Sequence, residues 1–372
     1  MSPRKKNAEK KPVHLIAYEW LSANIAPIAE AITARVFALH PELEARYGER
    51  GRAKCEQDSV FHLHYLAEAI AGNSEKMFVD YVGWAKIMLL SRGVGPADLG
   101  DNLKVIAHVL QLKSPAKYKR IFAQLIDAAL TQLPAMPEAL PGFIDRGNPF
   151  AELANSYLQR LLLLNREDAI ALVTTELDAG LSIRDLFHHV IYPVQREVGR
   201  LWQENRINVL QEHYCTAATD LLITGLKHNF QAVPRSVRAL AVCPDGEEHS
   251  LGIKMFSELL ESDGWKVAYM GPKCPLQDVL RHIKNHDTDL VAISVATPLN
   301  LAKTKELIAG IRSFSRDRTP AILVGGAALN SNPEIEKYLQ ADGVAADVSE
   351  GVEIANRLVA RKKLDKPGYV VA

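Results

Sequence analysis

Residues 243–255 read CPDGEEHSLGIKM and join two segments with different hydrophobic periods. The apolar run before them, residues 237–242, is typical of a buried strand, and a helical pattern follows. His249 is therefore expected in a loop at the carboxyl end of a strand, where open α/β sheets bind ligands. The nearby helix N-terminus disfavours a cationic imidazole, and Glu247 can hold one ring nitrogen, which leaves the other free to bind a metal. Gly252 would let a large group approach the backbone. On spacing alone, a buried structural histidine is the alternative.

The composition is that of an ordinary globular protein. Of 372 residues, 48% are hydrophobic and 24% are charged, and the formal net charge is zero. A neutral chain gives no reason to expect nucleic acid or an acidic membrane as a partner. The basic run at residues 4–11 is expected to be a solvated tail. The four cysteines form no CxxC pair, which argues against a zinc site or a disulfide framework. Because no apolar run reaches the ~18 residues of a membrane span, we expect a soluble cytoplasmic protein.

The first half of the chain indicates one all-helical domain and a linker. Residues 13–135 show helical patterns throughout, and an apolar pattern runs without a break from Ile16 to Val36. Turn residues interrupt the later helices at Pro41, 48–51, Gly72, 93–95 and Ser114-Pro115. This predicts a domain of globin-like size. Residues 136–149 are rich in proline and glycine, which is typical of a linker between domains.

The second half changes its hydrophobic period near residue 234. Residues 150–232 predict a four-helix bundle, with helices at 150–164, 167–179, 183–202 and 210–230 and with N-caps at Asn165 and Ser182. Residues 234–364 then alternate strand-like and helical runs. The expected strands are 237–243, 266–270, 290–295, 321–324 and 343–345. This alternation predicts a doubly wound parallel sheet of flavodoxin type.

The segment EEHSLG, residues 247–252, resembles the DxHxxG motif of cobalamin-binding domains, with Glu247 in place of the leading aspartate. Two further motifs agree with this resemblance, namely SVAT at residues 294–297 and the pair Gly325-Gly326. In that family the histidine is the lower axial ligand of cobalt, and the nucleotide tail of the cofactor enters the sheet past small residues. The resemblance implies that His249 binds cobalt, that Glu247 orients it, and that Gly252, Ser294, Thr297, Gly325 and Gly326 line the path of the tail.

A second motif lies in the expected bundle. Trp202 and the pair Glu212-His213 are separated by nine residues, which resembles the Wx9EH motif of cobalamin photoreceptors. In those proteins the bundle covers the upper cobalt face around a 5′-deoxyadenosyl group. An indole can cover the adenine, while a carboxylate and an imidazole can hydrogen-bond the ribose hydroxyls. The resemblance therefore implies adenosylcobalamin as the cofactor. A tryptophan in a helix core beside a solvated Glu-His pair is the alternative.

One position departs from that family. Its light-sensing transcriptional repressors carry a histidine directly after the tryptophan, and this histidine can become the upper cobalt ligand after photolysis. The corresponding residue here is Gln203. The departure argues against a bis-histidine photoproduct formed by that route, and His188, His189 or His213 would have to substitute.

The N-terminal region also differs from those repressors, because nothing in residues 13–135 resembles a winged helix-turn-helix. A globin-like domain joined to a bundle and a cobalamin domain resembles the photocobilins, which bind biliverdin in that first domain. The candidate bilin contacts are His62, His64, Tyr65, Tyr81 and Trp84. His62 and His64 lie on nearly opposite sides of a helix, so at most one faces a given pocket. A packed or solvated histidine and haem ligation are the alternatives, and Cys55 offers a covalent attachment point, although a lone cysteine is more often inert.

Together these resemblances imply a light sensor and not an enzyme. Light would break the cobalt–carbon bond and change the domain arrangement, the oligomeric state or a contact with a protein partner. Two alternatives stay open. The first is a corrinoid carrier for methyl transfer, which would prefer methylcobalamin. The second is a haem- or redox-responsive sensor with structural cobalamin, which pigment extraction would identify.

Overall fold

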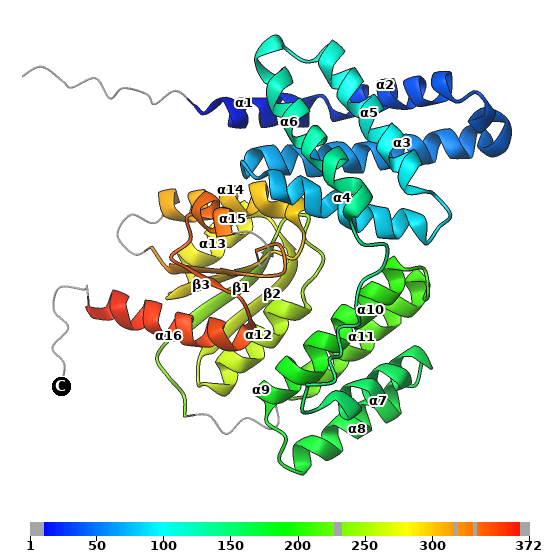
Figure 1. The fold of residues 1–372 in the computed structure, drawn as a ribbon. Coiled ribbons are helices and arrows are strands. Elements are labelled where there is room, and N and C mark those ends of the chain that lie inside the picture. The colour runs from blue at the N-terminus through cyan, green and yellow to red at the C-terminus, as the bar shows by residue number, and fades with distance from the viewer. Residues whose placement is uncertain (1–10, 227–232, 315–318, 330–332, 365–372) are drawn as a thin grey trace, which may run out of the picture. The chain divides into compact units, whose positions relative to one another are not determined.

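The computed structural model describes residues 11–226, 233–314, 319–329 and 333–364, which form two compact units, Met1–Pro137 and Glu138–Ala372 (Figure 1). Residues 4–10 of the expected basic tail lie outside the described ranges. Within those ranges, no helix combines the length and the apolar character that crossing a membrane requires.

The described part of the first unit consists of helices, as the sequence predicts. They are α1 (Val13–Ala23), α2 (Ile25–Leu39), α3 (Glu42–Ala71), α4 (Glu75–Leu90), α5 (Pro96–Lys113), α6 (Ala116–Gln132) and the short 3-10 turn η1 (Leu133–Ala135). The unbroken helix expected from Ile16 to Val36 is wrong, because the chain turns at Asn24. The turn uses the Asn24 side chain, whose amide donates to the carbonyl of Trp20. A globin-like fold stays a prediction.

Turn residues end the helices of this unit where the sequence places them. Gly48 interrupts α3 with φ +56° and ψ −154°, a conformation that residues with a Cβ rarely adopt. Only Gly48 leaves the helical conformation, so the expected break over residues 48–51 is confined to one residue. Ser74 begins α4 by accepting a hydrogen bond from the backbone N–H of Met77.

The second unit begins with the bundle. Its helices are α7 (Ala151–Leu162), α8 (Arg166–Asp178), α9 (Ile183–Asp185), the π-helical turn η2 (Leu186–Ile191), α10 (Tyr192–Gln203) and α11 (Val209–Gly225). Asn165 and Ser182 are N-caps, as predicted, and accept from the backbone N–H of Asp168 and Asp185. The last bundle helix was expected to reach Phe230, but residues 227–232 lie outside the described ranges.

The helix expected over residues 183–202 is present, and a π-helical turn lies in its middle. The cause is Pro193, which has no N–H to donate to the carbonyl of His189 and whose ring would clash with it. The backbone N–H of Tyr192 instead donates to Phe187, five residues earlier. The freed His189 carbonyl accepts a hydrogen bond of 2.6 Å from the side-chain amide of Asn148.

Residues 138–149, which we call the strap, pack against this composite helix. The backbone N–H of Leu140 donates to Glu204 at 3.3 Å, and that of Phe143 donates to Glu197 at 2.9 Å. The Arg200 guanidinium lies between these two carboxylates and bonds both. The expected linker, residues 136–149, is thus divided, because its larger part is hydrogen-bonded to α10 within the second unit.

The remainder of the second unit is a parallel sheet with strand order β2-β1-β3-β4-β5, the doubly wound order that the sequence predicts. The strands are β1 (Arg238–Pro244), β2 (Lys266–Cys274), β3 (Leu290–Ser294), β4 (Ala321–Gly325) and β5 (Gly343–Ala345). All adjacent strands pair in parallel, and β2 continues four residues beyond its expected end at 270.

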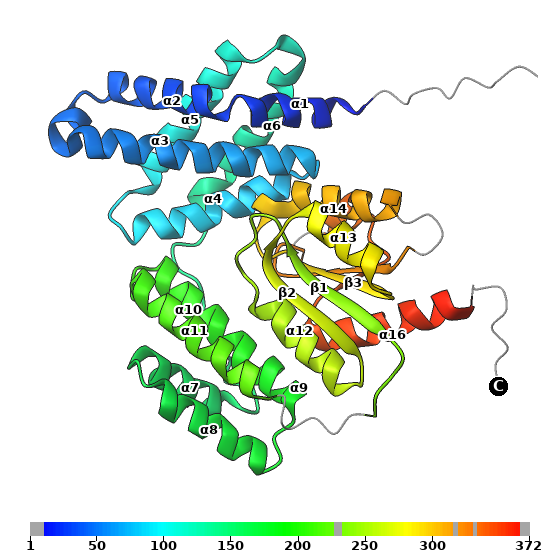
Figure 2. The same ribbon diagram turned by 180° about the vertical axis from the view of Figure 1, so that it is seen from behind.

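Helices cover both faces of the sheet (Figures 1 and 2). Helices α12 (Leu251–Ser262) and α16 (Val348–Leu364) lie on one face, while α13 (Leu276–Asn285), α14 (Leu301–Phe314) and α15 (Pro333–Leu339) lie on the other. In the sheet, β1 lies between β2 and β3, so the chain passes from β1 to a strand on one side of it and then crosses to a strand on its other side. The carboxyl ends of β1 and β3 therefore form the topological switch point, where open α/β sheets bind ligands.

Candidate functional site

Glu247 is the centre of the switch point. It follows β1, and its side chain is fully buried. One carboxylate oxygen accepts from Nδ1 of His249 at 2.6 Å and from the backbone N–H of the same residue at 3.0 Å. The other oxygen accepts from the loop after β3, namely from the N–H groups of Ala296 and Thr297 at 3.0 and 3.1 Å, from the Thr297 hydroxyl and from the Asn300 amide. The carboxylate thus ties the His249 loop to the neighbouring strand.

The same contacts fix the protonation of both side chains. Burial raises the pKa of Glu247, but the hydrogen bonds from His249, Asn300 and Thr297 outweigh it and lower the pKa to about 2. Because an ionised carboxylate only accepts, Nδ1 of His249 carries a proton, and in the neutral ring Nε2 is the nitrogen with a free lone pair. The His249 side chain is 66% exposed, so Nε2 can meet a ligand.

The pKa of His249 moves opposite to the direction expected from the helix N-terminus alone. The hydrogen bond to Glu247 raises the pKa of His249, and the charge of Glu247 adds to this effect. A carboxylate 2.6 Å away acts more strongly than the partial charge of a helix end. What keeps Nε2 available is therefore the orientation that Glu247 imposes.

Small residues gather beside this loop, at the ends of β3 and β4. Ser294 pairs with Gly325 in the sheet, and a Cβ built on Gly252 would meet only the Ser294 hydroxyl, at 3.8 Å. A Cβ on Gly325 would lie 3.5 Å from a backbone oxygen, which is ordinary contact. This row of small residues fits a flat group that enters between strand ends. Gly326 is different, because its φ is +116° and a Cβ would lie 2.2 Å from the carbonyl oxygen of Val295.

The Wx9EH residues come from two helix ends. Trp202 lies in the last turn of α10 and packs partly buried against the core, while Glu212 and His213 lie in the first turns of α11. A turn at residues 204–208 separates them, as the sequence predicts, and Asn208 caps α11. The charge of Glu212 contributes to the raised pKa of His249, which places Glu212 near the switch point.

The other candidate upper ligands differ in position. Gln203 is only 4% exposed. His213 is 69% exposed beside Glu212, at 3.6 Å. His188 and His189 lie in the π-helical turn, roughly 20 Å along the composite helix from Trp202. Three histidines could replace the upper ligand that Gln203 does not provide. Of these, only His213 lies at the same end of the bundle as Trp202.

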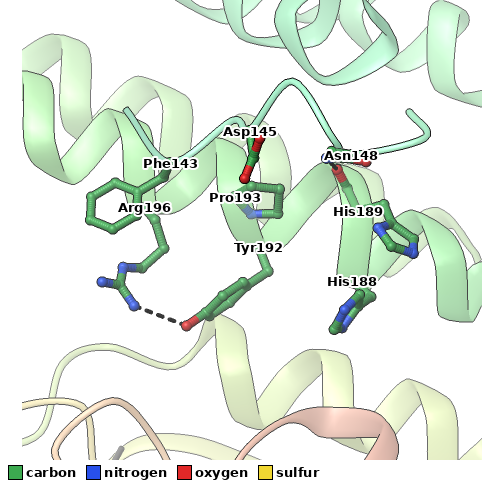
Figure 3. Close-up of a pocket in the computed structure, with 8 residues that line it drawn as sticks. All are labelled: Phe143, Asp145, Asn148, His188, His189, Tyr192, Pro193 and Arg196. Atoms are coloured by element: carbon green, nitrogen blue, oxygen red, sulfur yellow. Dashed lines mark hydrogen bonds between the residues drawn. The ribbon is translucent and has the colours of Figure 1, made fainter. Parts of the chain in front are cut away.

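His188 and His189 instead line an open cavity of about 260 Å³ between the strap and α10 (Figure 3). Tyr192 and Arg196 complete its helical side and are joined by a hydrogen bond of 2.9 Å. The guanidinium carbon of Arg196 lies 4.3 Å from the centroid of the Phe143 ring.

In the first unit, four of the five candidate bilin contacts form one aromatic cluster. The Tyr81 and Tyr65 rings stack with centroids 3.7 Å apart, and Trp84 lies 6.3 Å from Tyr81. His62 is buried, and its Nδ1 is 2.8 Å from the Tyr81 hydroxyl. Burial lowers the pKa of His62 to about 4, so its ring is neutral at neutral pH.

The remaining candidates of the first unit lie elsewhere. His64 points to solvent, as expected for a residue two positions after a buried one on a helix. Burial raises the pKa of the Cys55 thiol, which makes it a poor nucleophile. Among the described residues, no group of three or more His, Cys, Asp or Glu side chains could hold a metal ion.

Sequence reasoning missed part of the site. Asn300 and Ala296 donate hydrogen bonds to Glu247, and so does Thr297, which the sequence predicts along the path of the nucleotide tail. These residues lie 49 to 53 positions after Glu247. The available signal was the strand order, because parallel neighbours bring their carboxyl ends together.

Comparisons with known proteins found similarities in sequence and in fold. Residues 237–356 and residues 153–227 match two models that both describe a B12 binding domain. The HTH-type transcriptional repressor CarH of Myxococcus xanthus is 24% identical over 241 residues, 63% of this chain and 78% of the repressor. Dimethylamine corrinoid protein 3 of Methanosarcina acetivorans is 25% identical over 169 residues, 42% of this chain and 77% of that protein. The solved monomethylamine corrinoid protein of Methanosarcina barkeri covers 56% of this chain and 99% of its own, with 17% identity and a TM-score of 0.49.

Proposed function

We propose that this chain is a light sensor that binds adenosylcobalamin. The premise is that its two matches to B12 binding domains make it a cobalamin-binding protein. His249 is the lower cobalt ligand, and Trp202, Glu212 and His213 cover the adenosyl group. The observation that carries the proposal is the state of His249. A buried carboxylate fixes its Nδ1, and its Nε2 is exposed at the switch point of the sheet.

When bound, adenosylcobalamin supplies a cobalt–carbon bond that visible light breaks. The protein residues supply a fixed floor and a selective cover. Glu247 holds His249 in one tautomer and one orientation, so the lower ligand needs no rearrangement. Glu212 and His213 offer an acceptor and a donor to ribose hydroxyls, and they lose these partners when the adenosyl group is absent. We propose that the bundle then moves against the sheet, or that the oligomeric state or a contact with a protein partner changes.

A spectroscopic experiment tests this proposal. The protein is loaded with adenosylcobalamin in the dark, and its absorbance spectrum and its elution volume from a sizing column are compared before and after green light. We expect both to change. If both stay the same, the protein is not a light sensor of this kind.

Two substitutions test the assigned residues. His249→Ala should abolish the spectrum of cobalamin with a histidine lower ligand, whereas His286→Ala, at an exposed position just after α13 and before β3, should retain it. Trp202→Ala should weaken the binding of adenosylcobalamin about tenfold relative to that of methylcobalamin, because a methyl group has no adenine for the indole to cover.

A corrinoid carrier for methyl transfer is the second candidate, because dimethylamine corrinoid protein 3 is 25% identical over 169 residues. A carrier of this kind would hold methylcobalamin, which leaves nothing for Glu212 and His213 to bind. Methylcobalamin binding much tighter than adenosylcobalamin would favour the carrier.

For the first unit we propose that the cluster of His62, Tyr65, Tyr81 and Trp84 binds biliverdin. The stacked rings offer aromatic faces, and the neutral His62 offers a polar group next to a buried hydroxyl. Haem is the alternative chromophore. Pigments extracted from protein made with and without added biliverdin decide between them, and recovery of haem alone from cells that make both would exclude the bilin proposal.

A further inference from the structure

Lys254 joins the sheet part of the second unit to the bundle. It lies in α12, its side chain is 10% exposed, and its ammonium group reaches α11. Nζ donates to the backbone carbonyl of Asp220 at 3.0 Å, to the carboxylate of the same residue at 2.6 Å and to the Thr224 hydroxyl at 2.6 Å. All three donors of the ammonium group are thereby used. A largely buried charge with three partners holds its position, because moving it would leave the charge unpaired.

The position of Lys254 within α12 connects it to the site. His249 lies in the loop directly before this helix, and Gly252 in its first turn faces Ser294. Two residues of helix turn the side-chain direction by about 200°, so Lys254 points nearly opposite to Gly252. One short helix therefore has the expected path of the nucleotide tail on one side and the bundle on the other.

On the other side of this contact, α11 links Lys254 to the cap. Asp220 follows Glu212 by eight residues, which is about 12 Å along a helix. Thr219, next to Asp220, binds the Tyr157 hydroxyl at 2.9 Å and the Gln195 amide at 2.7 Å. The helix is thus fixed to its own bundle and to α12 at the same level. A rotation of 10° about this level would displace Glu212 by about 2 Å, which exceeds the tolerance of a hydrogen bond.

We infer that Lys254 is a positioning residue for the upper cobalt face, which it sets by fixing α11 over the His249 loop, and that its contact with Asp220 and Thr224 is the pivot of the bundle. The inference rests on the proposed binding of adenosylcobalamin. The lower ligand is independent of this contact, because Glu247 and the loop after β3 hold His249. Loss of the ammonium group therefore affects the cap and spares the lower ligand.

The test uses the full chain with Lys254→Met, which keeps the aliphatic stem, and Lys254→Arg, which keeps the charge. Lys284→Met, at an exposed position on α13, controls for the loss of one positive charge from the same sheet domain. The first measurement is hydrogen–deuterium exchange of the cofactor-free protein. The exchange rate of the α11 amides should be about ten times higher in Lys254→Met and unchanged in Lys284→Met. In Lys254→Arg the rate should be intermediate between these two.

The second measurement is the ratio of the dissociation constants for adenosylcobalamin and methylcobalamin. Lys254→Met should shift this ratio about tenfold against adenosylcobalamin and retain the histidine-ligated spectrum. Wild-type exchange in α11 together with an unchanged ratio overturns the inference. If wild-type protein shows no preference for adenosylcobalamin, the proposed function fails, while the exchange measurement still decides whether Lys254 fixes α11. Thr224→Val removes one of the three acceptors and gives a smaller shift in the same direction if Lys254→Met does not fold.

Discussion

Replacing Glu247 by glutamine tests the centre of the site, because the new side chain has the same shape but one oxygen has become an NH2 group. If the NH2 group faces the loop after β3, the N–H groups of Ala296 and Thr297 lose their acceptor. Each buried N–H without a partner costs about 1–3 kcal/mol, so the free energy of unfolding should fall by about 4 kcal/mol. If the NH2 group faces His249 instead, it donates to Nδ1. The ring proton then moves to Nε2, which can no longer bind a metal.

Two measurements together cover both orientations of the glutamine. Urea unfolding of the cofactor-free protein, followed by circular dichroism, detects the loss of stability. The absorbance spectrum of the cobalamin-loaded protein detects the loss of the histidine ligand. Glu248→Gln is the matched control, because the Glu248 side chain is 71% exposed in its pair with Lys273 and its replacement should leave the stability unchanged. A Glu247→Gln protein with both the wild-type stability and the wild-type spectrum would refute the reasoning.

Three further predictions concern folding. Because the pKa of His62 is lowered to about 4, the unfolded chain takes up a proton between pH 6.5 and about 4 while the folded protein does not. The free energy of unfolding should therefore fall by about 2 kcal/mol from pH 7 to pH 5. A His62→Phe variant should lose this part of the pH dependence in urea titrations. Gly326→Ala should lower the free energy of unfolding by about 3 kcal/mol, because a Cβ would overlap the carbonyl oxygen of Val295, whereas Gly325→Ala should have little effect on folding; equal losses would contradict this. Arg200→Met should lower the free energy of unfolding by about 3 kcal/mol, because it leaves the carboxylates of Glu197 and Glu204 without their cation, and Arg200→Lys should recover part of this loss. A wild-type unfolding midpoint for Arg200→Met would exclude a role for this ion network.

The sheet could be predicted from the sequence because its strands are buried on both faces. Six of the seven residues of β1, Arg238–Pro244, are buried, and β3 is buried throughout. Such runs are nearly continuous in hydrophobicity and end abruptly at polar loops, so their bounds are visible without any partner. β2 at the sheet edge is mostly exposed, and its expected end was four residues short for this reason.

Features that depend on distant residues could not be predicted in the same way. The π-helical turn before Tyr192 needs Pro193, which the sequence shows, but also a donor for the freed carbonyl, which Asn148 supplies across 41 positions. The contact between Glu247 and His249 was predicted from their spacing, but the rise in the pKa of His249 depends on the 2.6 Å distance between them. The sequence shows which side chains can interact. How strongly they interact depends on the distances between them, which only the structure gives.

The strap has a practical consequence for building chimaeric proteins. Its residues complete the hydrogen bonding of the helix that carries Trp202, through Leu140, Phe143 and Asn148. A fragment cut at residue 150, where the first bundle helix begins, would leave two carboxylates and one carbonyl of that helix without these donors. The junction for grafting a different input domain onto the cobalamin module therefore lies before residue 138, and a graft made there retains the helix in its present form.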